Sequence, residues 1–139
     1  MIRIHSKNDT SALLHIIWRS SEGDKGKMNF LTPEDQCLQG AAGVSLPKDY
    51  TFGGPHKHLP QERTTNKTQE SFVVIRGSIE VEMYDTDNSF IGREILNAGD
   101  CYIYLGGGHS FKILTENSLF YEIKNGPYFG REKGKTFIK

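Results

Sequence analysis

The sequence has 139 residues, the usual size of one domain, and its 17 basic and 17 acidic side chains leave no formal net charge. A neutral chain without a basic run argues against nucleic acid and anionic membranes as main partners. Its longest apolar stretch is too short to span a bilayer, and its first residues lack the apolar core of a signal peptide. We therefore expect a cytoplasmic protein with reduced thiols and no membrane partner.

Short runs of β-branched and aromatic residues between glycines predict an all-β chain. Residues 9–19 are compatible with a short helix or a strand, and residues 36–46 with further strands. A regular series of strands is then predicted at residues 71–76, 78–84, 90–96, 101–105, 109–114 and 119–124. In the second of these, Ile79, Val81 and Met83 alternate with polar residues, which predicts one buried and one wet face. Many short strands at this spacing are typical of a sandwich or barrel.

Three motifs carry candidate chemistry, and each lies beside a proline or glycine turn. In His56-Lys-His58, residues two apart on a strand would direct both imidazoles to the interior and Lys57 outward. Glu70 opens a predicted strand and shares its face with apolar residues, while His109 follows three glycines and opens another. Since a buried carboxylate needs a partner, and three imidazoles with one carboxylate are a normal ligand set for Zn, Fe, Mn, Co or Ni, the sequence predicts one divalent metal ion.

These residues resemble the cupin family. Its first motif places two histidines one residue apart, then a glutamate, then a glycine seven positions later, and His56, His58, Glu70 and Gly77 match those places. The stretch from Gly99 to His109 is similar to its second motif, without the usual proline and asparagine. The resemblance implies a single cupin barrel, that is a double-stranded β-helix or jelly roll, with extra N-terminal strands. The loop between His58 and Glu70 is longer than in the family, so Glu62 stays an alternative carboxylate ligand.

A narrower resemblance links the chain to small cupin-fold metalloproteins encoded in bacterial lipopolysaccharide and O-antigen gene clusters. It rests on residues 55–58, 68–70, 99–100, 107–109 and 122–128, with Lys133 or Lys135 matching a lysine that recurs after the last segment. The resemblance implies a role in surface-polysaccharide or nucleotide-sugar metabolism. It does not name a reaction, because a shared fold does not fix a function.

Four functions fit these patterns. The first is a metal-dependent isomerase or epimerase acting on a sugar-derived small molecule, in which the metal stabilises a developing oxyanion. The second is a metal-free sugar-nucleotide epimerase or isomerase with histidine as general base. An iron-dependent dioxygenase and a non-catalytic sugar-binding module are the third and fourth. Arg63 is a candidate ligand for a substrate carboxylate or phosphate, and Tyr104 a candidate pocket residue.

We expect three parts of the chain: N-terminal strands at residues 1–35, the barrel at residues 36–125, and a C-terminal tail at residues 126–139 that packs on the barrel or on a partner. Open sheet edges predict a homodimer, with Ile16, Ile17 and Trp18 of the first segment at the contact. Cys37 and Cys101 do not suggest a disulfide framework, and Cys101 is interpreted as a small core residue.

Overall fold

The computed structural model describes residues 1–22, 27–30, 42–51, 53–127 and 129–139, and these form an almost entirely β structure. The all-β prediction is therefore confirmed. The strands are β1 (Ile2–His5), β2 (Leu13–Trp18), β3 (Lys27–Phe30), β4 (Ala42–Ser45), β5 (Glu70–Arg76), β6 (Ser78–Tyr84), β7 (Phe90–Asn97), β8 (Cys101–Tyr104), β9 (Gly108–Ile113) and β10 (Leu119–Lys124). A 3-10 turn, η1 (Ser20–Glu22), and one short helix, α1 (Arg131–Gly134), complete the elements. None of the described helices is long and apolar enough to cross a membrane.

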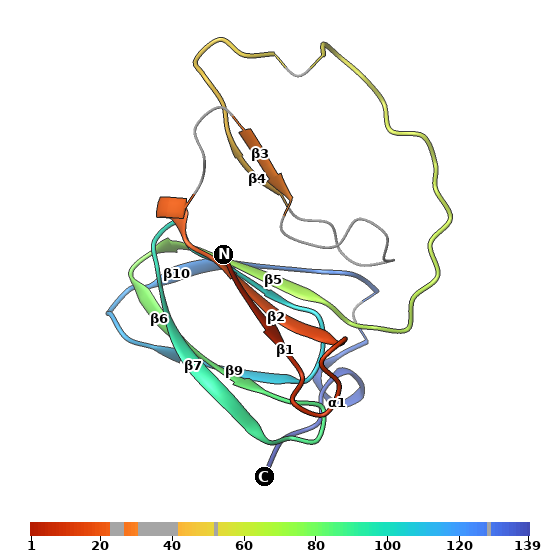
Figure 1. Cartoon of the computed structure of the whole chain (residues 1–139), viewed down its shortest axis with the longest axis vertical. Helices are drawn as coiled ribbons and strands as arrows, with labels where there is room; N and C mark the ends of the chain where they lie inside the picture. Colours follow the sequence, from red (N-terminus) through yellow and green to blue (C-terminus); the bar gives the residue numbers. More distant parts are fainter. Residues whose placement is uncertain (23–26, 31–41, 52, 128) are drawn as a thin grey trace.

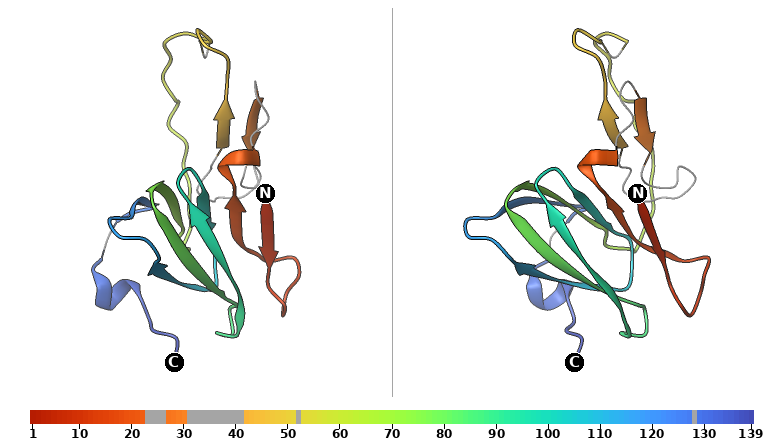
Figure 2. Two further views of the ribbon diagram at one scale, coloured as in Figure 1. Left: turned by 90° about the vertical axis from the view of Figure 1, so that its left-hand side faces the viewer. Right: turned by 60° about the vertical axis from the view of Figure 1, so that its left-hand side comes forward.

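Two antiparallel sheets face one another and enclose the main core (Figure 1; Figure 2). The larger sheet has the strand order β1-β2-β8-β5-β10, and the smaller one has the order β7-β6-β9. Strands that are neighbours in a sheet are mostly distant in the sequence, as in jelly-roll folds. This arrangement brings the starts of β5 and β9, which carry the predicted Glu70 and His109, to the same end of the sandwich.

Gly77, between the strands predicted at residues 71–76 and 78–84, forms a corner between the two sheets. β5 pairs with β8 and β10, whereas β6 pairs with β7 and β9, so the two consecutive strands do not pair with each other. Gly77 has φ 79°, a left-handed conformation that favours glycine. A Cβ at this position would also overlap the side chains of Ser118 and Thr115. Both constraints explain why the chain uses glycine where it changes sheets.

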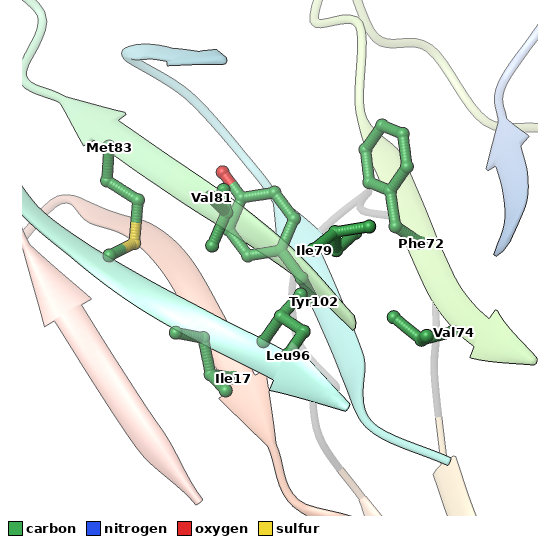
Figure 3. Packing of buried hydrophobic residues seen from close by; sticks show 8 residues of the cluster. All are labelled: Ile17, Phe72, Val74, Ile79, Val81, Met83, Leu96 and Tyr102. Carbon is green, nitrogen blue, oxygen red and sulfur yellow. The ribbon is translucent and has the colours of Figure 1, made fainter. Parts of the chain in front are cut away.

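The core confirms the alternation predicted for β6. Ile79, Val81 and Met83 are buried, and the residues between them are partly exposed. Apolar side chains from both sheets meet these three residues (Figure 3). They are Ile17, Phe72, Val74, Leu96 and Tyr102. Burial of this apolar surface is the main stabilising term for the sandwich.

The N-terminal strands belong to the larger sheet. The ambiguous region at residues 9–19 contains β2, which pairs with β1 on one side and β8 on the other. Ile17 packs in the main core, and Ile16 packs in a second cluster on the opposite face of the sheet. Both are fully buried within their own chain, so they are not available for the subunit contact expected from the sequence. The homodimer itself stays a prediction.

A two-stranded ribbon of β3 and β4 lies beyond the larger sheet, and a long segment, residues 46–69, leads from it to β5 (Figure 1). Its described residues, 46–51 and 53–69, contain no strand. The buried Gly43 of β4 lies against Trp18, and a Cβ there would overlap the indole ring. Of the strands predicted at residues 36–46, β4 is present, while residues 36–41 lie outside the described residues. At the other terminus, Ile138 packs against β9 at Gly108.

Of the two cysteines, only Cys101 lies among the described residues. Cys101 is free and partly buried, and it packs against the second apolar cluster. Burial raises the pKa of its thiol to about 11, which keeps it protonated and unreactive at neutral pH. This agrees with its interpretation as a small core residue. Cys37 lies outside the described residues.

Candidate functional site

Glu70 and His109 meet where the two sheets approach each other. Glu70 opens β5 in the larger sheet, and His109 is the second residue of β9 in the smaller one. Nε2 of His109 lies 3.2 Å from Oε2 of Glu70. The Glu70 side chain is 4% exposed and that of His109 is 15% exposed. Glu70, Phe72 and Val74 alternate along β5, so they share one face of the strand, and all three are buried.

Lys124 completes this pair from the neighbouring strand. It lies directly opposite Glu70 in the register of β10 and β5, which places two side chains on the same face. Its Nζ donates to Oε1 of Glu70 at 2.8 Å and lies 3.7 Å from Oε1 of Glu122. The His109 imidazole, together with Lys124, lowers the pKa of Glu70 to about 2 although burial opposes ionisation. Glu70 is therefore a buried, ionised carboxylate at neutral pH.

The interaction of Glu70 with its neighbours is incomplete. Oε2 of Glu70 and Nδ1 of His109 are both buried and have no hydrogen-bond partner among the described residues. The 3.2 Å contact between the two side chains thus lacks hydrogen-bond geometry. Buried polar atoms are nearly always satisfied, so an unsatisfied oxygen on Glu70 and an unsatisfied nitrogen on the neighbouring His109 indicate a place where another group binds.

Aromatic rings surround the His109 imidazole. The closest is Tyr104, whose ring centre lies 4.6 Å from that of His109 in an edge-to-face arrangement. The Tyr104 hydroxyl donates to the carbonyl of Gly107 at 2.8 Å, and burial raises the pKa of the phenol. Three further rings lie within 6.0 Å of the imidazole centre, those of Phe72, Tyr102 and Phe111. Tyr104 is thus beside His109, in a largely apolar setting that strengthens local electrostatic interactions. Its role as a pocket residue stays a prediction.

A buried histidine, His15, contacts one of these aromatic residues, Tyr102. His15 of β2 is fully buried, and its Nε2 donates to the carbonyl of Tyr84 at 3.3 Å. Because the carbonyl can only accept, Nδ1 carries no proton and accepts from the Tyr102 hydroxyl at 2.8 Å. Burial lowers the pKa of His15 to about 4, so the ring is neutral at pH 7. His15 therefore orients Tyr102 rather than contributing charge.

The other predicted site residues do not join this group. His56 and His58 are exposed on the segment at residues 46–69, with ring centres 5.2 Å apart. The prediction that they stand on a strand and face the interior is wrong. Alternation directs side chains inward only where a strand pairs in a sheet, and this segment has no paired neighbour. Glu62 and Arg63 are exposed on the same segment.

A metal ion fits part of this arrangement. Two ligands of one tetrahedral zinc ion, at usual bond lengths, lie about 3.3 Å apart. The 3.2 Å between Nε2 of His109 and Oε2 of Glu70 matches that spacing, and Lys124 holds the other carboxylate oxygen in place. Across the part of the chain that the structure describes, however, no group of three or more potential ligands is assembled. The four-ligand site formed by His56, His58, Glu70 and His109 stays a prediction.

Comparisons with protein-family models, with curated proteins and with solved structures found no match to this chain. The site is therefore interpreted from its own residues. Two contributors were not singled out from the sequence. Lys124 pairs with Glu70 through the register of β10 on β5, and His15 reaches Tyr102 from another strand. The available signal was weak: His15 is the titratable residue inside an apolar run, and Lys124 follows Glu122 at the end of another.

Proposed function

We propose that the chain is an enzyme that isomerises or epimerises a small, polar, sugar-derived molecule, with Glu70 and His109 at the reacting centre. The observation that carries the proposal is the ionised, nearly buried Glu70 beside the His109 imidazole, with no hydrogen bond among the described residues on Oε2 of Glu70 or on Nδ1 of His109. Buried groups of this kind are uncommon in a purely structural role, because each unsatisfied atom costs free energy. Such groups concentrate at sites where a ligand completes the hydrogen bonds.

In the first form of the proposal, one divalent metal ion is held by Glu70 and His109 together with His56 and His58. The resemblance to cupins suggests this ligand set. The separation of Oε2 of Glu70 from Nε2 of His109 supports these two residues as ligands of one ion. When bound, the ion would polarise a substrate carbonyl or hydroxyl. Lys124 would keep the Glu70 carboxylate in its ligating orientation. The long segment at residues 46–69 would have to fold toward β5 to bring the two remaining histidines to the site.

Metal content tests this form. The protein would be purified without a metal-affinity tag, and its bound metals, Zn, Fe, Mn, Ni or Co, would be measured by mass spectrometry. We expect near-stoichiometric metal, lost in His56→Ala, His58→Ala and His109→Ala. His5→Ala is the matched control, because His5 lies at the end of β1 and is not a predicted ligand. No metal in the wild-type protein, even after reconstitution, would exclude this form.

A second form needs no metal, and one observation favours it. The described structure already assembles Glu70, His109 and Lys124 without any residue of the segment at 46–69. A carboxylate that orients an imidazole is a recurrent arrangement in general acid–base catalysis. His109 would then move a proton at the substrate carbon, and Glu70 would stabilise the imidazolium. Turnover of a candidate sugar derivative that survives a strong chelator and His56→Ala, but not His109→Ala, would select this form over the first.

A further inference from the structure

A second group of charged residues lines a pocket next to Lys124. The pocket has a volume of about 520 Å³, and its lining comes from the end of β10, the segment that follows it, the C-terminal helix α1 and the residue after that helix. Its lining comprises Glu122, Lys124, Gly126, Arg131 and Lys135. Pockets of a few hundred cubic ångströms are the usual size for small-molecule sites. This one can therefore hold a molecule as large as a phosphorylated sugar.

The lining is positively charged. It carries three cationic side chains and one carboxylate, an excess of two positive charges. Lys124 is already engaged by Glu70 and Glu122. Within the described part of the chain, Arg131 and Lys135 have no carboxylate partner. The Arg131 guanidinium lies over the Phe137 ring, 5.2 Å from its centre, which restricts its orientation. Three cations that line one cavity with a single carboxylate create a local field that attracts an anion.

We propose that this pocket binds a phosphate or diphosphate group, with Arg131 and Lys135 as its ligands. A guanidinium donates two parallel hydrogen bonds to a phosphate, and an ammonium adds a mobile charge beside it. A carboxylate is a weaker match, because it has fewer acceptor oxygens and less charge to share between two cations. Glu122 lies on the same lining and disfavours large polyanions by repulsion, which suits a small phosphorylated molecule over a nucleic acid.

Lys124 connects this pocket to the reacting centre. The same side chain lines the pocket and donates to Oε1 of Glu70 at 2.8 Å. A molecule anchored by its phosphate at Arg131 and Lys135 would extend past Lys124 toward Glu70 and His109. This last step rests on the proposed function, whereas anion binding by the pocket does not. The substrate class of the site is then a sugar phosphate or a sugar linked to a diphosphate.

Calorimetric titration with inorganic phosphate and with pyrophosphate, at fixed ionic strength, tests the pocket. We expect binding by the wild-type protein and a loss of at least about tenfold in affinity for Arg131→Gln/Lys135→Gln, a factor typical of lost charge-assisted hydrogen bonds. The matched control is Lys112→Gln/Lys133→Gln, which removes two charges from β9 and α1 without touching the lining. Thermal melts of both double variants verify that the fold is kept.

The outcomes separate the pocket from the reacting centre. Tighter binding of pyrophosphate than of phosphate would support a diphosphate ligand, and the reverse a phosphate monoester. Equal affinities in the wild-type protein and the pocket variant, or no binding of either anion, would overturn the proposal. His109→Ala, titrated in parallel, is expected to keep its affinity. If metal content and turnover tests fail while this binding persists, the proposed function is wrong and the anion pocket stands.

Discussion

Two buried carboxylates lie at opposite ends of β8, and they differ in how completely they are satisfied. Asp100 precedes the strand and is 4% exposed, while Glu70 lies beside its last residue and is 3% exposed. Oδ1 of Asp100 accepts from the backbone N–H of Ser20, and Oδ2 accepts from the N–H of Asn97 and from Arg19. Glu70 has Lys124 on one oxygen and no hydrogen bond on the other.

The difference separates a structural carboxylate from a functional one. Burial raises the pKa of Asp100, but the hydrogen bonds from Asn97, Ser20 and Arg19 outweigh it and bring the pKa below its usual value. Both oxygens of Asp100 accept hydrogen bonds, which tie the turn before β8 to the end of β7 and to the segment after β2. Glu70 reaches an equally low exposure with fewer partners, so its free oxygen is available to a ligand. The two carboxylates therefore differ in how many of their buried oxygens accept hydrogen bonds, and much less in burial or charge.

The largest expected effect is on stability, from Asp100→Ala. Removal of the carboxylate leaves two backbone N–H groups and the Arg19 guanidinium without their acceptor, which costs about 3 kcal/mol of unfolding free energy. Urea denaturation measures the loss. Glu94→Ala is the control, because it removes only the exposed partner of Arg19 and should cost much less. A small effect of Asp100→Ala on the free energy of unfolding would show that Asp100 is not a structural carboxylate.

Acid pH should lower the free energy of unfolding through His15. This residue lies near the Glu70 end of β8, opposite Tyr104 in the register of β2 and β8. Its pKa is about 4 in the folded protein and 6.5 in the unfolded chain, because burial disfavours the charged ring. The neutral ring therefore contributes fully above pH 6.5, and roughly 3 kcal/mol is lost as the pH falls toward 4. Comparing urea midpoints of the wild type and His15→Gln across this range isolates the effect. Parallel pH profiles would contradict it.

Glu70→Gln should reduce stability and abolish function. The amide oxygen can still accept from Lys124, but the variant loses the ionised form that His109 and Lys124 stabilise. Since the pKa of Glu70 is about 2 against 4.5 in the unfolded chain, we expect a loss of up to about 3 kcal/mol at neutral pH, measured by urea denaturation. Metal binding or turnover should be lost in the same variant, because the negative charge beside His109 is gone. A variant that loses this stability and keeps metal binding and turnover would show that Glu70 is mainly structural.

The smallest effect is expected at an exposed ion pair in the smaller sheet. Arg93 lies 3.4 Å from Glu82, and its side chain is 59% exposed. Solvent and salt screen such a pair, so Arg93→Gln should leave the urea midpoint unchanged within error. This variant sets the baseline against which the two buried carboxylates are compared. A clear loss of stability would show that charge alone, without burial, is important in this fold.

The sequence predicted the sandwich strands well because their signal is local. β6 alternates strictly because one of its faces lies in the core, and β10 has the predicted bounds, with Phe120 packed against the core. The pair of Glu70 and His109 was also predicted, because both follow recognisable turns. Lys124 was not, since its partner is set by the pairing of β10 with β5, and no local pattern encodes that pairing. The prediction that His56 and His58 stand on a strand was wrong for a related reason. A strand-like sequence pattern does not guarantee a neighbouring strand with which to pair.

The contact between Trp18 and Gly43 gives the molecule a built-in optical label. Trp18 is the only tryptophan of the chain, and its indole lies against the ribbon from which residues 46–69 depart. Indole emission depends on local polarity, so lifting the ribbon would shift its wavelength without any added dye. Titrating metal while recording this emission would thus report whether the histidine-bearing segment changes position when the ion binds. A shift that disappears in His58→Ala would tie that rearrangement to coordination.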